Sequence, residues 1–249
     1  MRTTTPILPV LAASFVAMIA SGVAGCSSAT SDPATGASSG TPAGTSGGTT
    51  PAPKVPPKGE PAGPAPVDPT NDPGLGPCTG TAGQLNALMP KKLTVGDDVP
   101  LCKFDGNVLL IVNVASHCGN TPQYTPLEAL YQTYRARGFY VLGFPSPQFG
   151  GQEFANEADV TAFCTSTYKI TFPMFAIGDV NGPNKQPVYT WLHGQPGGPP
   201  PDGYARDVQW NFEKYLINRH GAIVSRIENG TAPDDPTVIA AIEAELAKK

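Results

Sequence analysis

Hydrophobic and polar residues follow two distinct patterns from about residue 108 onward in this 249-residue chain. The continuous β-branched and apolar run over 108–114 predicts a strand that is buried on both faces. Apolar residues at helical spacing over 126–137 predict a helix, and a second apolar run at 139–144 predicts another strand. A connection of this length between two strands favours parallel pairing through a right-handed crossover.

The pattern continues to the end of the chain. Asn156 is a typical N-cap for a helix that extends to Tyr168, and Asp235 starts an amphipathic helix through Ala247. We also expect strands at 172–177, 210–217 and 222–227, a short helix at 186–193, and a short strand around Cys102. This order predicts an α/β domain with a thioredoxin-like fold, in which helices flank a central mixed sheet.

Residues 1–25 combine one Arg with an apolar run from Ile7 to Ala24, which is typical of a secretory signal sequence rather than a spanning helix. The run leads into Val23-Ala-Gly-Cys26, which resembles a bacterial lipobox, where the cysteine becomes the lipid-modified first residue of the mature protein. An ordinary N-terminal membrane anchor is the alternative. We therefore expect an exported bacterial lipoprotein, anchored in a membrane at its periplasmic or extracytoplasmic face.

Residues 26–77 are almost entirely Gly, Pro, Ser, Thr and Ala. Such a segment buries too little apolar surface to offset the entropy of ordering. We expect a disordered tether that spans about 40 Å as a flexible coil, followed by a single domain over 78–249. The net charge of −4 comes without a basic patch, which argues against a nucleic-acid partner.

The chain has five cysteines, and an odd number needs an explanation in an exported protein. Lipidation of Cys26 supplies one. We expect Cys78 and Cys102 to form a disulfide that stabilises the domain by roughly 3 kcal/mol, with two free thiols as the alternative. Cys118 and Cys164 then remain for chemistry. Because the chain has no C-x-x-C motif, it suggests neither a zinc ribbon nor a dithiol site, and we expect no metal and no cofactor.

Cys118 follows the first core strand and precedes a helix. Unpaired backbone N–H groups and the positive end of a helix dipole favour thiolate over thiol at such a junction. A buried and inert cysteine is the alternative. This feature alone does not decide between the two.

Several segments, in order, resemble the glutathione peroxidase family from about Leu93 to Leu246. They are Leu110-Ile-Val-Asn-Val-Ala-Ser-His-Cys-Gly119, Thr121-Pro-Gln-Tyr124, Leu142-Gly-Phe-Pro145, Gln148-Phe-Gly-Gly-Gln-Glu153, Thr171-Phe-Pro-Met-Phe175 and Trp210-Asn-Phe212. By position, the resemblance implies that Cys118 is the peroxidatic cysteine and that Gln152, Trp210 and Asn211 complete the catalytic tetrad. It also implies that Cys164 is the resolving cysteine of members that thioredoxin-like proteins recycle.

The chemistry of these residue types agrees with the resemblance. Each hydrogen bond to a charged group contributes roughly 1.5–3 kcal/mol, and one pKa unit corresponds to about 1.4 kcal/mol, so two donors would make Cys118 mostly thiolate. The Trp210 indole and the amides of Gln152 and Asn211 are suitable neutral donors. Taken alone, Trp210 is more typical of a core or surface aromatic residue, the two amides of loop positions, and Cys164 of a helix-face core residue.

The chain departs from the family pattern at several places. Ser146-Pro147 replaces a common Cys-Asn, which removes a third redox cysteine, and Phe154-Ala155 replaces a usual Pro-Gly. The basic cluster for tight glutathione binding has no match, and 193–207 is too short for the long oligomerisation loop of tetrameric members. Both departures favour a monomer whose reductant is thioredoxin-like rather than glutathione. His117 is a further candidate, as a cation beside the thiolate, unless its side chain points away.

We therefore expect a thiol peroxidase for hydrogen peroxide and for organic or lipid hydroperoxides, in which Cys164 captures a Cys118 sulfenic acid as a disulfide. The alternatives are a peroxide sensor or disulfide relay, and a non-catalytic tethered binding module. A disulfide needs Cα atoms within about 7 Å. We expect the reduced protein to hold the two thiols apart, so that the disulfide requires local unfolding of the 156–168 helix.

Overall fold

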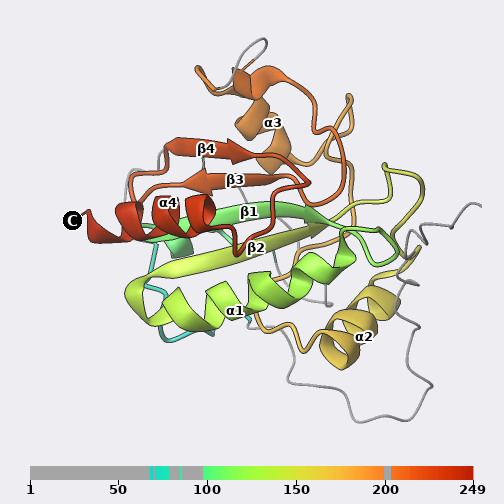
Figure 1. Cartoon of the computed structure of the whole chain (residues 1–249), viewed down its shortest axis with the longest axis horizontal. Coiled ribbons are helices and arrows are strands. Elements are labelled where there is room, and N and C mark those ends of the chain that lie inside the picture. Colours follow the sequence, from blue (N-terminus) through green and yellow to red (C-terminus); the bar gives the residue numbers. More distant parts are fainter. Residues whose placement is uncertain (1–67, 70, 79–84, 86–97, 199–202, 249) are drawn as a thin grey trace, which may run out of the picture. The chain divides into compact units, whose positions relative to one another are not determined.

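A mixed four-stranded sheet in the order β2-β1-β3-β4 lies at the centre of the domain (Figure 1). β1 (Val108–Val114) pairs in parallel with β2 (Phe139–Pro145) and antiparallel with β3 (Lys214–Ile217). β4 (Ile223–Ile227) pairs antiparallel with β3. The parallel β1–β2 pair, joined through a helix, confirms the predicted crossover unit.

The computed structural model describes residues 68–69, 71–78, 85, 98–198 and 203–248. The predicted signal sequence, Cys26 and the tether up to residue 67 lie outside these residues. No helix of the described part is both long and apolar enough to cross a membrane.

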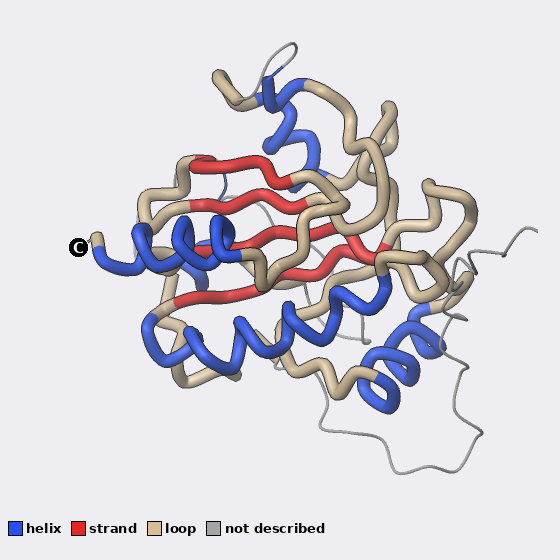
Figure 2. The backbone as a smooth tube through the Cα atoms, in the orientation of Figure 1, coloured by secondary structure: helices blue, strands red, loops and turns tan. Residues whose placement is uncertain are grey.

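Among the described residues, four α-helices flank the sheet, as Figure 2 shows. They are α1 (Tyr124–Tyr134), α2 (Glu157–Thr167), α3 (Pro187–Gly194) and α4 (Pro236–Ala247). Short 3-10 helices are η2 (Leu101–Phe104), η3 (Thr121–Gln123), η4 (Arg135–Arg137) and η5 (Gly203–Ala205). The predicted α/β, thioredoxin-like arrangement of a mixed sheet flanked by helices is confirmed.

Side-chain caps fix two helix starts where the sequence predicts them. Asn156 Oδ1 accepts a hydrogen bond from Asp159 N at 2.9 Å, which caps α2. Asp235 Oδ1 accepts one from Thr237 N at 2.8 Å, which caps α4. Each bond satisfies an N–H group that has no partner within the helix.

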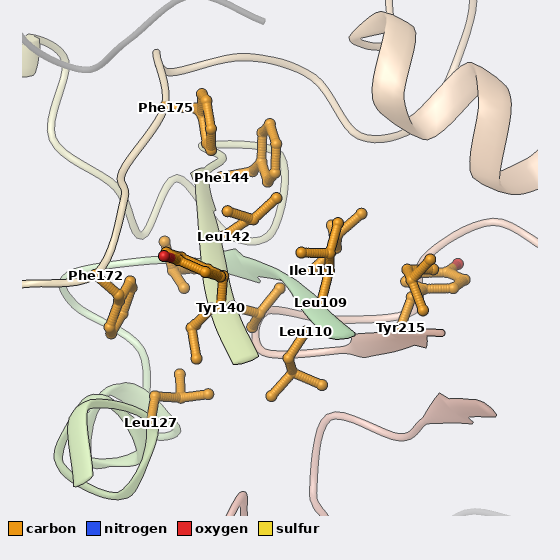
Figure 3. Close-up of a cluster of buried hydrophobic side chains, with 14 of the residues drawn as sticks. Leu109, Leu110, Ile111, Leu127, Tyr140, Leu142, Phe144, Phe172, Phe175 and Tyr215 are labelled. Carbon is orange, nitrogen blue, oxygen red and sulfur yellow. The ribbon is translucent and has the colours of Figure 1, made fainter. Parts of the chain in front are cut away.

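The core lies on both sides of the sheet, because β1 and β2 are buried along their whole length. Leu127 of α1 and Leu110 of β1 lie on one side of the sheet and belong to the same core (Figure 3). Leu142, Phe144 and Phe175 gather on the other side, where the rings of Phe144 and Phe175 stack at 4.6 Å. The continuous apolar runs of the sequence thus correspond to strands covered on both faces.

Three of the predicted strands are wrong in whole or in part. The segment 172–177 forms only an isolated bridge, in which Met174 lies beside Gly143 of β2. Pro173 has no N–H to extend a ladder, and a Cβ at Gly143 would collide with Met174 Sδ. Cys102 lies in η2 rather than in a strand. Residues 210–213 form a turn before β3, with Phe212 in the left-handed region at φ 70°.

The domain begins earlier than the predicted boundary at residue 78. Asp72 is buried, where its Oδ1 accepts hydrogen bonds from Gly74 N at 2.8 Å and Arg135 Nη2 at 2.9 Å. Leu75 belongs to the hydrophobic core. Cys78 and Cys102 form a disulfide. An apolar residue and a paired carboxylate within a polar low-complexity segment are enough to attach its last residues to the domain.

Candidate active site

Cys118 lies in a tight loop directly after β1, and its side chain is only 4% exposed. The Thr121 hydroxyl accepts a hydrogen bond from Cys118 N at 2.9 Å and donates one to Ala115 O at 2.8 Å. These bonds hold the loop closed. Asn120 N donates a hydrogen bond to Cys118 Sγ at 3.3 Å, so the sulfur has a backbone donor in the loop.

The structure refines the predicted junction of strand and helix. The helix α1 begins only at Tyr124, after the short turn η3. The donor that reaches the sulfur is therefore the N–H of Asn120 in the loop, rather than the first turn of α1.

Gln152 and Asn211 meet beside this loop, although they are far apart in sequence. Asn211 Nδ2 donates to Gln152 Oε1 at 3.0 Å. The loop of Cys118 bonds to both residues, because His117 N donates to Gln152 O at 2.9 Å and Asn120 Nδ2 donates to Asn211 O at 3.3 Å. Within the described residues, however, no side-chain hydrogen bond links either amide to the Cys118 sulfur.

Asn211 also keeps an unused acceptor in the site. Its side chain is fully buried, and its Oδ1 has no hydrogen-bond partner. A buried carbonyl oxygen without a partner carries a desolvation cost that a bound O–H group would relieve. The arrangement is suited to a small substrate that carries a hydroxyl.

Trp210 lies at the surface of the same region and is 39% exposed. Its ring packs against Phe149 with centroids 5.7 Å apart. No hydrogen bond between its indole N–H and Cys118 occurs in the described part of the chain. The backbone of Trp210 is held instead by Asn113 of β1, whose Nδ2 donates to Trp210 O.

Asn113, which the sequence analysis did not single out, holds the Trp210–Asn211 turn. Its Nδ2 donates to Trp210 O at 3.0 Å, and its Oδ1 accepts from Glu213 N at 3.0 Å. Its backbone O accepts from Phe212 N at 2.7 Å. A fully buried asparagine within the apolar strand β1 was the signal that could have identified it.

A buried ion pair supports the same turn from the other side. Glu213 and Arg226 pair through Oε1 and Nε, with both side chains fully buried. The second carboxylate oxygen of Glu213 accepts from Gln209 N at 2.8 Å. The guanidinium of Arg226 donates to the carbonyl oxygens of Arg206 at 2.6 Å and Asp207 at 2.9 Å. The chain before Trp210 is thereby fastened to β3 and β4.

Cys164 lies on α2 and is completely buried as a free thiol. Its Sγ donates to Tyr124 Oη at 3.6 Å. Burial raises the pKa of this thiol to about 12; the Tyr124 hydrogen bond opposes the shift and the charge of Glu153 adds to it. In this packed position Cys164 is a weak nucleophile, because the thiolate is the reactive form.

His117 packs as an aromatic side chain. Its ring contacts Phe154 with centroids 4.3 Å apart and lies 6.3 Å from the ring of Phe163. Phe154, one of the departures from the family pattern, thus fills the space between the Cys118 loop and α2. These contacts favour the interpretation in which the imidazole points away from the sulfur.

The described residues contain no cluster of His, Cys, Asp and Glu that could hold a metal ion.

Comparisons with known proteins find relatives of this chain. The family model described as glutathione peroxidase matches residues 87–193. The hydroperoxy fatty acid reductase gpx1 of Synechocystis sp. is 47% identical over 142 residues, which cover 56% of this chain and 84% of that protein. The thioredoxin/glutathione peroxidase BtuE of Escherichia coli is 43% identical over 169 residues, with 61% and 92% covered.

Solved structures show the same relationship. The apo form of Trgpx is 32% identical at a TM-score of 0.52, over 67% of this chain and 98% of that chain. The T. cruzi GPX1 structure is 30% identical at a TM-score of 0.51, over 65% and 95%. Sequence identities of this size, over most of the length of each relative, show membership of the same family. The chain belongs to the glutathione peroxidase family and is a peroxidase.

Proposed function

We propose that this protein is a thiol peroxidase that reduces hydroperoxides through Cys118, with Cys164 as the resolving cysteine. The observation that carries the proposal is the position of Cys118 in a closed loop after β1, with Asn120 N directed at its sulfur and the bonded amides of Gln152 and Asn211 alongside. The names of two relatives, a hydroperoxy fatty acid reductase and a glutathione peroxidase-like peroxiredoxin, support the substrate class.

The proposed first step is attack of the Cys118 thiolate on the terminal peroxide oxygen. An S–O bond forms, the O–O bond breaks, and the leaving alkoxide takes a proton to give an alcohol, or water from hydrogen peroxide. The amide groups of Gln152 and Asn211 are suited to hold the peroxide and to stabilise the alkoxide. The product on Cys118 is a sulfenic acid.

In the second step, Cys164 attacks the sulfenic sulfur, a disulfide forms and water leaves. A thioredoxin-like protein would then reduce the disulfide. The resolving cysteine and the name of the BtuE relative, which includes both thioredoxin and glutathione, support this reductant class without excluding glutathione. We expect a monomer.

The direct test compares Cys118→Ser with the parent protein in peroxide consumption. The variant should lose turnover, and full turnover would refute the proposal. Cys164→Ser should still form the sulfenic acid but no intramolecular disulfide. Turnover with thioredoxin set against glutathione, each with hydrogen peroxide and a phospholipid hydroperoxide, then identifies the reductant and the preferred substrate.

A peroxide sensor or disulfide relay is the second candidate, and the complete burial of Cys164 favours it. A thiol that must first leave a packed helix would prolong the life of the sulfenic acid, which gives a partner protein time to react. A mixed disulfide with one specific partner under peroxide stress, together with negligible steady-state turnover, would favour this role.

We further propose that the protein is an exported lipoprotein, anchored through Cys26. The lipobox-like sequence supports this, and the Cys78–Cys102 disulfide suits an oxidising compartment. Labelled palmitate should be incorporated into the parent protein but not into Cys26→Ser. Equal labelling of both would contradict the proposal.

A further inference from the structure

Glu153, directly after Gln152, carries a carboxyl group that is buried without a cation. The residue is only 7% exposed. Its Oε1 accepts a hydrogen bond from Phe154 N at 2.9 Å, whereas its Oε2 is buried and has no partner. Among the described residues, no Lys, Arg or His forms an ion pair with it. A charged carboxylate in such a place has a large desolvation cost.

The Glu153 carboxyl group lies between the Cys118 loop and the helix α2, which carries Cys164. On one side, Ser116 of the Cys118 loop is near enough to lower the pKa of Glu153. On the other side, Phe154, the next residue in the chain, packs its ring 5.8 Å from that of Phe163, which precedes Cys164 on α2. Burial raises the pKa values of Cys164 and Tyr124, and the charge of Glu153 adds to both shifts. The other titratable groups of this region are His117, which packs on Phe154, and Tyr168 at the end of α2.

The two groups differ in how readily they hold a proton. Burial raises the pKa of Glu153 to about 7, with Ser116 and Phe154 N opposing the shift. The carboxyl group can therefore accept and release a proton near neutral pH. Cys164 needs such a partner, because its buried thiol is almost fully protonated.

On the basis of the function proposed above, we propose that Glu153 is the proton acceptor for the Cys164 thiol in the resolving step. The carboxylate takes the proton as Cys164 leaves its buried position, where a thiolate is most costly. The Cys164 thiolate attacks the sulfur of the Cys118 sulfenic acid, an S–S bond forms and the S–O bond breaks. The hydroxide that leaves takes the proton back from Glu153 and becomes water.

The electrons and protons balance in this sequence. The Cys164 sulfur is oxidised, the Cys118 sulfur is reduced from the sulfenic to the disulfide state, and one water is released. No other reactant is required. Glu153 returns to its carboxylate form, and the external reductant then reduces the disulfide between Cys118 and Cys164.

The experiment compares single turnovers of the full chain in the parent, Glu153→Gln and Glu153→Asp. Stopped-flow tryptophan fluorescence follows sulfenic acid formation, and dimedone trapping at timed points follows its loss to the disulfide. Glu153→Gln should form the sulfenic acid within about twofold of the parent rate but resolve it about 100-fold more slowly. The inflection near pH 7 in the resolving rate should disappear.

Two further variants separate proton transfer from packing. Glu153→Asp retains a carboxyl group and should keep a pH inflection in the resolving rate. Glu157→Gln, on the first turn of α2, is the matched control and should leave both steps unchanged. A merely structural role for Glu153 would alter stability without removing the inflection.

Resolution by Glu153→Gln at the parent rate, or with the parent pH profile, would overturn the inference and leave the peroxidase proposal intact. If Glu153→Gln does not fold, an Asp variant without a pH inflection would overturn it equally. Peroxide turnover that survives Cys118→Ser would instead refute the proposed function itself.

Discussion

Replacing Arg226 with methionine isolates the contribution of the buried ion pair that fastens the Trp210 turn. Methionine has a similar length and no charge, so the change removes the partner of Glu213 and the donors to the carbonyl groups of Arg206 and Asp207. We expect the variant to lose stability and, because the turn loosens, to lose peroxidase activity as well.

The magnitude follows from the burial of both side chains. Removing one member of a fully buried pair typically costs about 3–5 kcal/mol, because a charge is left without compensation. Arg206 Nη2 lies 3.5 Å from Glu213 Oε1 and partly replaces the lost cation. We therefore expect a loss of about 3 kcal/mol, which is a large part of the ~5–15 kcal/mol that stabilises a typical domain.

Urea denaturation of the parent, Arg226→Met, Glu213→Gln and the double variant measures the effect as a free energy of unfolding. The double variant should lose less than the sum of the single losses, because no charge is left unpaired. Glu228→Gln is the control: it breaks a pair with Arg206 in which Glu228 is 55% exposed, and should cost below about 1 kcal/mol.

The reasoning would be refuted if Arg226→Met lost less than about 1 kcal/mol, since the buried charge would then be compensated in another way. It would also be refuted if Glu228→Gln cost as much as Arg226→Met. Strict additivity in the double variant would show that the two side chains do not interact.

Asn113→Ala removes two hydrogen bonds to the 210–213 turn. We expect urea denaturation to show a free energy of unfolding lower by about 2 kcal/mol, and we expect slower peroxide turnover. Unchanged turnover would contradict the role of Asn113 in holding this turn. Replacing both Cys78 and Cys102 with serine should lower the free energy of unfolding by about 3 kcal/mol. Adding reductant to the parent protein should lower its free energy of unfolding by the same amount. Burial raises the pKa of Glu153 from its ordinary 4.5 to about 7 in the folded protein. Ionisation of Glu153 should therefore remove up to about 3 kcal/mol from the free energy of unfolding as the pH rises from 4.5 to about 7. Glu153→Gln should lack this decline, and parallel pH profiles of the free energy of unfolding in the parent and the variant would contradict the prediction.

Local patterns were sufficient to predict the β1–α1–β2 unit and the closing helix. Both faces of β1 and β2 are covered, so an apolar run without alternation identifies them. The caps of α2 and α4 also depend on residues three or fewer positions away. By contrast, 172–177 has the composition of a strand, but Pro173 and a single close approach at Gly143 leave it as one bridge.

The sequence indicated candidate residues for the site, whereas their contacts with one another depend on the fold. Motif positions indicated Gln152 and Asn211, and the structure brings their amides together. Asn113 joins β1 to a turn about one hundred residues later, and Glu153 interacts with a thiol on another element. Such pairs depend on tertiary packing. Asn113 leaves a local trace, as a polar residue within an apolar run, whereas Glu153 leaves none.

The contacts of residues 71–78 determine where the upstream chain joins the domain relative to Cys118. Asp72 binds Arg135 beyond the far end of α1, and Cys78 is bonded to η2, just before β1 begins. Cys118 follows the opposite end of β1, about 20 Å along the strand; Figure 1 shows segment 68–78 and this loop at opposite ends of the sheet. The chain upstream therefore joins the domain at the end of the sheet opposite to the Cys118 loop. If the chain upstream is attached to a surface, the Cys118 loop lies at the end of the domain opposite to the point of attachment, so the attachment itself does not obstruct a bulky reductant that approaches this loop.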